Sequence, residues 1–320
     1  MPPWVLVCGS VAMDYVGRYR GSFASYQSRY DIEALNISLQ LADLRSSFGG
    51  CGMNITYGLK KLDIPVIPLS AAGTDFLDHY QQHLNALGVN SDHIIVDQSF
   101  PRCATALVIS DDHGNQITCF HAGASISPLR ELPRDIDGTE DCQIAILAPE
   151  DAPVMLRQGR DLHELGIPVI FDPGQGIAEF SREDILELLL LSDSAIFNLH
   201  EYEILKQNAG LTASDLEQMM KRIIITRAAE GVDVFENGTM LHVDAVTCHK
   251  IADPTGCGDA FRAGYIYGLM HGYDALVSVR LGCLLAAINL EYMDTQTYDV
   301  DVKSLTTRYK NSYGESISSG

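Results

Sequence analysis

Residues 253–261 read Asp253-Pro254-Thr255-Gly256-Cys257-Gly258-Asp259-Ala260-Phe261, and they lead directly into a stretch of small and apolar residues that ends near Met270. This composition is typical of a helix that packs closely in a core. The first N–H groups of a helix have no partner within it, so an anion can bind there. Two glycines let such an anion approach the main chain. The stretch therefore predicts an anion-binding loop at a helix start.

Asp259 leaves two interpretations of this loop open. Aspartate is common at helix starts, where its side chain caps the helix. Next to a bound phosphate, however, its charge is unfavourable unless it takes a proton from the group that attacks the phosphate. In that second interpretation Asp259 is the general base of a phosphoryl transfer. The N–H groups of Gly256, Cys257 and Gly258 then receive the charge on the phosphoryl oxygens.

Outside this loop, short apolar strands alternate with amphipathic helices. The alternation predicts an α/β fold with three layers, in which a mainly parallel central sheet lies between two layers of helices. The expected strands are 5–7, 66–69, 144–147, 169–171, 195–197 and 222–226. The expected helices are 52–61, 75–87, 153–165, 181–191, 199–207, 212–220, 255–271 and 273–290.

Two segments, about 14–45 and 98–121, interrupt this alternation. Residues 36–40 read as an alternating strand segment, and residues 105–110 and 116–120 predict a β-hairpin around a short polar turn. Such strands predict a small β-sheet that stands apart from the main sheet as a lid, within a single domain spanning 1–320. Exposed strand edges often pair, so we expect a homodimer that forms through the lid.

The overall composition limits the class of partner. The chain has 22 basic and 42 acidic residues, a net charge of −20, which disfavours nucleic acid and anionic membrane surfaces as partners. Its first residues lack the basic region of a signal peptide, and no apolar run approaches the length of a membrane span. Eight scattered cysteines without a Cys-x-x-Cys pair indicate reduced thiols. We therefore expect a cytoplasmic protein with small-molecule substrates.

Two further loops place polar groups where open α/β sheets bind ligands. Asp14 follows the first strand, and it is either a solvated acid or an acceptor for two neighbouring sugar hydroxyls. Residues 48–54 form a glycine-rich turn that opens a helix, which is either a tight turn or a binding loop. In the second case Asn54 can donate to and accept from a hydroxyl.

Two loops after later strands suit a nucleotide. Asn198 and Glu201 form an Asn-x-x-Glu pair, which is either a helix cap or a pair of oxygen ligands for hydrated Mg²⁺. Residues 226–231, from Thr226 to Gly231, have the position of a nucleotide-edge loop. Each pattern is weak by itself.

Taken in order, these motifs resemble the ribokinase-like family of carbohydrate and nucleoside kinases, also called the phosphofructokinase-B type. Residues 49–54 match its first signature, residues 253–261 match its second, and residues 198–201 match its magnesium motif. The resemblance covers about residues 5–290. Within the family the chain looks most like the bacterial adenosine kinases. The residues that carry this likeness are 9–14, 37–39, 172–175 and 253–264.

The resemblance implies an ATP-dependent adenosine kinase of purine salvage, which phosphorylates the 5′-hydroxyl of adenosine to give AMP and ADP. Asp259 would be the catalytic base, with Asp14 and Asn54 on the ribose and Phe120 stacked on the base. The implied substrate-binding residues are Ser10, Asp14, Ser38, Gly50, Asn54, Phe120 and Gln175. Those implied for ATP are Asn198, Thr226 and Gly231. Asn198 and Glu201 would hold Mg²⁺ through water, and Asp253 and Thr255 a monovalent cation such as K⁺.

The chain departs from the family pattern at two positions. Ala228 stands where the family's Thr-x-Gly-x-x-Gly loop has its middle glycine, which bears on ATP binding. Ala106 stands where a second aromatic residue would contact the base, which bears on base specificity. A ribokinase or another sugar kinase of the same family remains an alternative, as does a nucleoside-binding protein without activity. Phe120 disfavours the first alternative and Asp259 disfavours the second.

Overall fold

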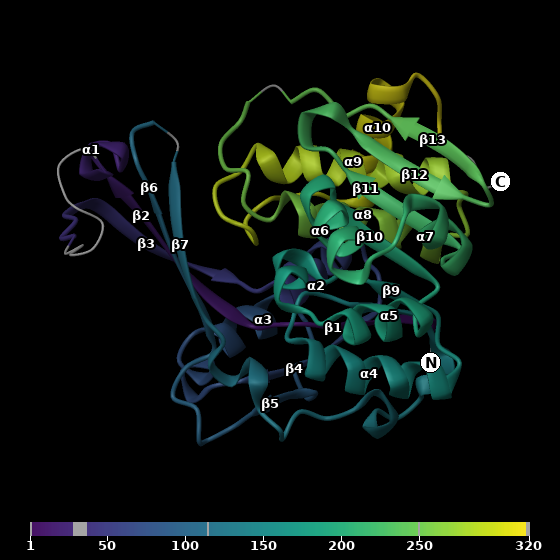
Figure 1. Cartoon of the computed structure of the whole chain (residues 1–320), viewed down its shortest axis with the longest axis horizontal. Helices are drawn as coiled ribbons and strands as arrows, with labels where there is room; N and C mark the ends of the chain where they lie inside the picture. The colour runs from purple at the N-terminus through teal and green to yellow at the C-terminus, as the bar shows by residue number, and fades with distance from the viewer. Residues whose placement is uncertain (1, 28–36, 114, 249, 318–320) are drawn as a thin grey trace.

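The computed structural model of the protein describes residues 2–27, 37–113, 115–248 and 250–317. Most of its strands belong to one large sheet (Figure 1). In spatial order these strands are β13 (Thr239–Val243), β12 (Val232–Glu236), β11 (Arg222–Thr226), β10 (Ser194–Asn198), β9 (Val169–Phe171), β8 (Cys142–Leu147), β1 (Trp4–Cys8), β4 (Val66–Ala72) and β5 (Ile94–Val96). The pairs are parallel except for those that β12 makes, which are antiparallel.

Helices cover both faces of this sheet, which confirms the expected three-layer α/β architecture. Successive strand residues point to opposite faces, so Val5 and Val7 enter one core while Leu6 enters the other. The first core is closed by α2 (Cys51–Lys61), α8 (Cys257–Met270), α9 (Ala275–Leu290) and α10 (Val302–Tyr313). The second core is closed by α4 (Ala152–Leu165), α5 (Arg182–Leu190), α6 (Leu199–Ala209) and α7 (Ala213–Met219).

Small residues bring the helices of the first core close together. A Cβ atom on Gly264 of α8 would lie 2.5 Å from the carbonyl oxygen of Leu281 in α9, and one on Gly268 would lie 2.6 Å from Ser278 Cα. The predicted small-residue helix is therefore confirmed, and its glycines allow the backbones of α8 and α9 to touch. Close packing of this kind fixes the start of α8 relative to the sheet.

The small sheet consists of β3 (Leu41–Gly49), β2 (Ala12–Tyr19), β6 (Ala104–Ser110) and β7 (Gln116–His121), in that spatial order. It projects from the body of the molecule, with α1 (Ala24–Gln27) at its far end (Figure 1). The predicted hairpin is present as β6 and β7, which pair antiparallel. The expected strand at 36–40 is wrong for residues 37–40, which precede β3 without forming a strand. Asn36 lies outside the described residues.

The helix expected at 75–87 is divided into two pieces. A short 3₁₀ helix, η2 (Thr74–Leu77), comes first, and α3 (Tyr80–Ala86) follows after a break. In the first piece, the Asp75 carboxylate accepts a hydrogen bond from the N–H of Cys103 at 2.8 Å and lies near Arg102. These contacts join the first turn to the segment that enters β6.

Besides the short elements β5 and α1, two parts of the fold were absent from the sequence prediction. One is the β12–β13 hairpin, whose turn residues Asn237 and Gly238 both have positive φ, at 52° and 74°. Asn-Gly between two strands is the usual signal for this turn, so the sequence did contain it. The other is α10. The remaining 3₁₀ helices are η3 (Gly123–Ile126), η4 (Pro133–Asp135), η5 (Thr139–Asp141), η6 (Gly174–Glu179) and η7 (Ala228–Glu230).

Candidate active site

The loop at the start of α8 has the conformation of an anion site. Gly256 caps the helix with a φ of +76°, and a Cβ there would lie 2.8 Å from the side chain of Thr295. Among the described residues, the N–H groups of Gly256, Gly258 and Asp259 find no acceptor, whereas the N–H of Cys257 donates to the Pro254 carbonyl at 3.3 Å. Three N–H groups are thus available to a ligand, and that of Cys257 is already in use.

Asp259 does not cap α8. Its carboxylate oxygen Oδ2 accepts a hydrogen bond from Asn54 Nδ2 of α2 at 2.7 Å, and α8 has no side-chain cap. Burial raises the pKa of Asp259 to about 6, against the hydrogen bond from Asn54 and the charge of Arg262, which lower it. The carboxylate therefore lies beside the available N–H groups as a base of moderate strength. Of the two interpretations left open by the sequence, capping of α8 by the Asp259 side chain is not what the structure has.

A chain of hydrogen bonds fixes the orientation of Asn54. Gln296 Nε2 donates to Asn54 Oδ1 at 2.9 Å and to the Tyr80 hydroxyl at 2.8 Å, while its Oε1 lies 2.9 Å from His83 Nε2. Because Asn54 Oδ1 is occupied in this way, its amide nitrogen must face Asp259. No local pattern pointed to Gln296, which lies 242 positions from Asn54 along the chain.

Asp14 lies on β2, close to Asp259. It packs directly on Gly49, where any side chain would overlap its carboxylate. Burial raises the pKa of Asp14 to about 6, and the charge of Asp259 adds to this effect. Gly50 has a φ of +91° and lies against the Ser10 carbonyl, which brings both residues to the same corner. The structure therefore brings Asp14, Ser10 and Gly50 together with Asp259.

Phe120 shares a face of the small sheet with Asp14. Asp14 on β2 is paired with Ala106 on β6, which is paired with Phe120 on β7, and residues directly opposite each other point to the same face. The Phe120 side chain is 65% exposed, so the ring is available to a ligand. Ser38 is placed differently, beyond the end of β3 that lies farther from Asp14.

Asp172 and Arg262 form a buried ion pair at the carboxyl edge of the large sheet. Arg262 Nε and Nη2 donate to the two carboxylate oxygens of Asp172 at 2.6 and 2.8 Å, and both side chains are almost fully buried. Arg262 Nη1 also donates to the Gly258 carbonyl at 3.2 Å. The pair joins the end of β9 to the first turns of α8. Gln175 follows in η6, where it is exposed.

Asn198 and Glu201 cap α6. The N–H of Asn198 donates to Glu201 Oε2 and the N–H of Glu201 donates to Asn198 Oδ1, both at 2.8 Å. Burial raises the pKa of Glu201, and the charge of Asp172 raises it further. No cluster of three or more His, Cys, Asp or Glu side chains in the described ranges could hold a metal directly. The oxygen atoms of Asn198 and Glu201 are of the kind that a hydrated Mg²⁺ binds, usually through its retained waters.

The loop after β11 has two residues with positive φ, Ala228 and Gly231. Ala228 has a φ of +50°, the left-handed conformation in which glycine is favoured. Gly231 has a φ of +100°, and a Cβ there would overlap the Val243 carbonyl. Thr226 ends β11 with its hydroxyl 3.4 Å from the Phe197 carbonyl. Ala228 thus adopts a conformation that a glycine at this position would adopt without strain.

Asp253 is already occupied by hydrogen-bond donors. Its Oδ1 accepts the N–H of Thr255 at 2.9 Å, and its Oδ2 accepts Arg45 Nη2 at 2.9 Å and the N–H of Asp294 at 3.3 Å. Burial works to raise the pKa of Asp253, but the hydrogen bonds from Thr255 and the charge of Arg45 outweigh it and hold the pKa below its usual range. These residues do not fit the expected monovalent cation, because a guanidinium lies on the carboxylate.

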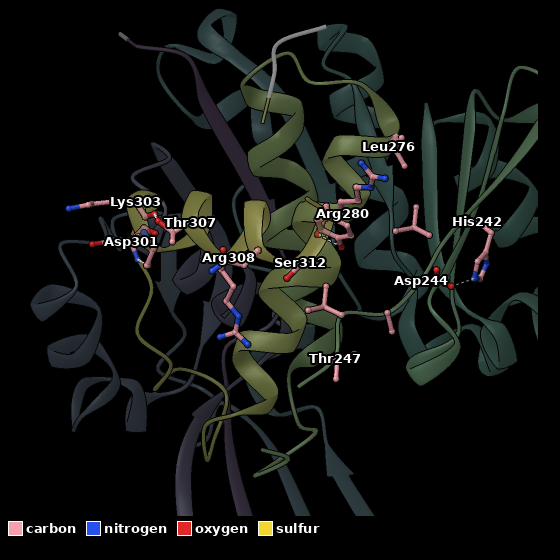
Figure 2. A pocket seen from close by; sticks show the side chains of 16 residues that line it. His242, Asp244, Thr247, Leu276, Arg280, Asp301, Lys303, Thr307, Arg308 and Ser312 are labelled. Atoms are coloured by element: carbon pink, nitrogen blue, oxygen red, sulfur yellow. Dashed lines mark hydrogen bonds and ion pairs between the residues drawn. The ribbon is translucent and has the colours of Figure 1, made fainter. Parts of the chain in front are cut away.

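A hollow of about 960 Å³ lies elsewhere, between α9, α10 and the segment after β13 (Figure 2). Its two arginines already have partners within the described part of the chain, since Arg308 pairs with Glu291 and Arg280 with Glu315. None of the residues expected from the sequence to bind substrate or ATP lines it. Within the described ranges, no helix is both long and apolar enough to cross a bilayer.

Known proteins resemble the chain over nearly its whole length. The pfkB family carbohydrate kinase profile matches residues 5–302. The nucleoside kinase of Methanocaldococcus jannaschii is 28% identical over 263 residues, which are 82% of this chain and 85% of that protein.

Solved structures agree with the fold. The nucleoside kinase of Burkholderia thailandensis in complex with inosine is 29% identical and has a TM-score of 0.88, with 98% of this chain and 99% of that chain covered. The same enzyme in complex with ADP and inosine is 28% identical and has a TM-score of 0.86, with 99% and 98% covered. The fold is thus that of the ribokinase-like proteins, as the sequence predicted.

Proposed function

The chain belongs to the pfkB family of carbohydrate kinases, and on that premise we propose that it is an ATP-dependent nucleoside kinase that converts adenosine to AMP at the 5′-hydroxyl. One observation supports the proposal most strongly. Asp259 is held by Asn54 at the start of α8, beside N–H groups that have no acceptor within the described residues. A carboxylate in this position does not cap the helix, but it can accept a proton during a phosphoryl transfer.

The reaction follows from this geometry. The 5′-oxygen attacks the γ-phosphorus of ATP, and its proton passes to Asp259. The bond between the γ-phosphorus and the bridging oxygen breaks, and ADP leaves. The N–H groups of Gly256 and Gly258 receive the charge on the phosphoryl oxygens, as preformed donors do in other transferases. Arg262 stays paired with Asp172, so its role is to hold the loop rather than to bind phosphate.

The small sheet supplies the nucleoside side of the site in this proposal. The carboxylate of Asp14 and the second amide N–H of Asn54 bind the ribose hydroxyls, with Ser10 and Gly50 behind them. Phe120 stacks on the base, because its exposed ring lies in register with Asp14, and Gln175 borders the base. Ser38 lies beyond the far end of β3 and has no role here. Segments 14–45 and 98–121 would close over the bound nucleoside as a lid and exclude water.

ATP lies along the carboxyl edge of the large sheet in this proposal. Asn198, Thr226 and Gly231 border it, and Mg²⁺ on its phosphates would be oriented through water by Asn198 and Glu201. When bound, this ion neutralises phosphate charge. We assign no K⁺ to Asp253 and Thr255, because Arg45 lies on the carboxylate.

Two further proposals concern the whole protein. We expect a homodimer through the small sheet, because its edge strands β3 and β7 carry exposed apolar side chains such as Leu44 and Ile117. We also expect the protein to work in the cytoplasm in purine salvage, since all eight cysteines are free thiols in the structure. Sedimentation velocity tests the first of these expectations.

A substrate panel tests the function. Purified protein with ATP and Mg²⁺ is given adenosine, inosine, guanosine, ribose or fructose, and the phosphorylated products are separated. We expect AMP from adenosine as the most efficient reaction. A preference for inosine, which the Burkholderia thailandensis enzyme binds, would move the assignment to another nucleoside. Turnover confined to ribose or fructose would make the protein a sugar kinase.

A further inference from the structure

Arg45 connects the small sheet to the body of the protein. It lies on β3, and its guanidinium reaches two carboxylates at once. Its Nη2 lies 2.9 Å from Asp253 Oδ2, and its Nε lies 2.8 Å from Asp294 Oδ1. The acids are largely buried, with side chains 9% and 24% exposed, while that of Arg45 is 38% exposed. Among the described residues, no other basic side chain pairs with either acid.

The two carboxylates come from different segments that meet near the catalytic loop. Asp253 precedes α8 by four residues, and Asp294 follows α9. Asp294 has a φ of +66°, which is unusual for a residue with a side chain, and its N–H donates to Asp253 Oδ2 at 3.3 Å. A residue with a side chain keeps this unfavourable backbone conformation only where the surrounding structure holds it in place. Arg45, Asp253 and Asp294 therefore form a closed ring of polar contacts.

This ring lies in an acidic neighbourhood. Asp14 experiences the negative charges of Asp259 and Asp294, which add to the effect of burial in raising its pKa. Two largely buried acids such as Asp253 and Asp294 need a positive charge between them. A planar guanidinium that forms two hydrogen bonds, and that is more weakly hydrated than an ammonium, is well suited to supply it. A metal cation in this position would have to displace Arg45 from Asp253.

We propose that Arg45 takes the place of a monovalent cation at Asp253, and that it thereby fastens strand β3 to the loop that begins α8. Arg45 is thus a positioning residue, which acts on the catalytic loop through Asp253. The wild-type protein needs no K⁺ as a consequence. Loss of the guanidinium opens a cation site between Asp253 and Asp294. The kinetic part of this inference rests on the proposed function, whereas the binding part does not.

The first experiment measures cation binding without catalysis. Thermal melting of the ligand-free protein is recorded in KCl and in tetramethylammonium chloride at equal ionic strength. We expect no K⁺-specific stabilisation of the wild type and a clear rise in melting temperature for Arg45→Met. Arg45→Lys keeps a positive charge but not the two-armed guanidinium, so its K⁺-specific rise should be smaller than that of Arg45→Met. Arg18→Met is the matched control, because Arg18 is also on the small sheet but pairs with Asp112, at the exposed surface.

The second experiment measures nucleoside phosphorylation in the same two salts. The wild type and Arg18→Met should show equal rates in both. K⁺ should raise kcat/KM of Arg45→Met by ~5-fold, the factor to which about 1 kcal/mol of regained ion pairing converts. Specific stabilisation or activation of the wild type by K⁺ overturns the proposal. So does an Arg45→Met protein whose melting temperature and kcat/KM are both unchanged by K⁺. If no variant phosphorylates any nucleoside, the proposed function fails while the melting result still decides the role of Arg45.

Discussion

At the scale of single residues, the chemistry depends on how Asp259 is surrounded. Burial and nearby acids favour its neutral form, whereas the hydrogen bond from Asn54 favours its charged form. Gln296 determines which end of the Asn54 amide faces Asp259. Gln296 thus bears on the pKa of Asp259 through Asn54, without touching Asp259.

The first prediction concerns the pH dependence of the rate. The pKa of Asp259 lies near 6, above its ordinary value, so the base becomes protonated and kcat/KM falls as the pH drops through about 6. The pKa of Asp14 is also raised to about 6. The fall of kcat/KM at low pH, the acidic limb of the pH profile, therefore reports the titration of Asp14 and Asp259 together. Gln296→Leu leaves the Asn54 amide free to turn and so weakens its hydrogen bond to Asp259. Because that bond lowers the pKa of Asp259, the variant's acidic limb should move to higher pH. Gln158→Leu, which alters a buried glutamine of α4, should leave the limb in place; an unmoved limb in both variants refutes this role of Gln296.

The second prediction concerns the loop after β11. Ala228 holds a left-handed conformation that is unfavourable for any residue with a Cβ. Ala228→Gly should therefore raise the free energy of unfolding by up to about 1 kcal/mol, measured by urea denaturation. Ala229→Gly, at the next position, is the control and should not stabilise the protein. A less stable Ala228→Gly protein would contradict the explanation.

At the scale of elements, the contact between α8 and α9 determines where the catalytic loop lies. Both helices carry small residues at the contact, so their backbones touch at Gly264 and Gly268. The sheet provides the other constraint, since Asp172 at the end of β9 holds Arg262 of α8 by two hydrogen bonds. The loop is thus fixed by one apolar contact and one ionic contact.

The third prediction tests the helix contact. Gly264→Ala places a methyl group against the Leu281 carbonyl, which cannot move without disturbing α9. We expect a loss of about 1–3 kcal/mol in the free energy of unfolding, the usual cost of overpacking. Gly159→Ala in α4 is the matched control, because its nearest neighbours are side-chain methyl groups at 3.3 and 3.4 Å. That variant should be neutral or more stable, and equal losses in both variants would refute the backbone contact.

Prediction from the sequence succeeded where the signal was local. The apolar strands and the glycine-rich start of α8 follow from neighbouring residues, and the fold follows from their alternation. The Asn-Gly turn of the β12–β13 hairpin was an available signal that was overlooked. By contrast, the partners of Asp259 and Asp253 come from residues more than 200 positions away, Asn54 and Arg45. Pattern and spacing contain no information about such pairs, which arise only when the helices and both sheets assemble.

At the scale of the whole molecule, the site lies between two sheets. The large sheet and α8 supply the catalytic loop, while the small sheet supplies Asp14, Phe120 and Arg45. The net charge of −20 does not favour an anionic substrate by itself, so the proposed binding of ATP would depend on local N–H groups and on a bound metal ion. The position of the small sheet therefore bears on both nucleoside binding and the catalytic loop.

The fourth prediction tests the small sheet as a nucleoside-binding surface. Phe120→Ala removes the exposed ring that lies in register with Asp14. We expect the dissociation constant for adenosine, measured by titration calorimetry, to rise ~5–100-fold, since stacking of a base on an aromatic ring contributes about 1–3 kcal/mol. Ile117→Ala is the control, because Ile117 lies three residues away on β7 and faces the opposite side. Unchanged affinity in Phe120→Ala would remove Phe120 from the site.

The central claim is that Asp259 is the base of a phosphoryl transfer to a nucleoside. The most direct measurement is kcat for AMP formation from adenosine and ATP by Asp259→Asn, which keeps the shape of the side chain but cannot take the proton. Asp301→Asn, a change at the N-cap of α10, is the control. We predict a loss of at least ~10²-fold in kcat for Asp259→Asn alone, the usual scale of general base catalysis. Near-normal turnover by a folded Asp259→Asn protein would contradict the account.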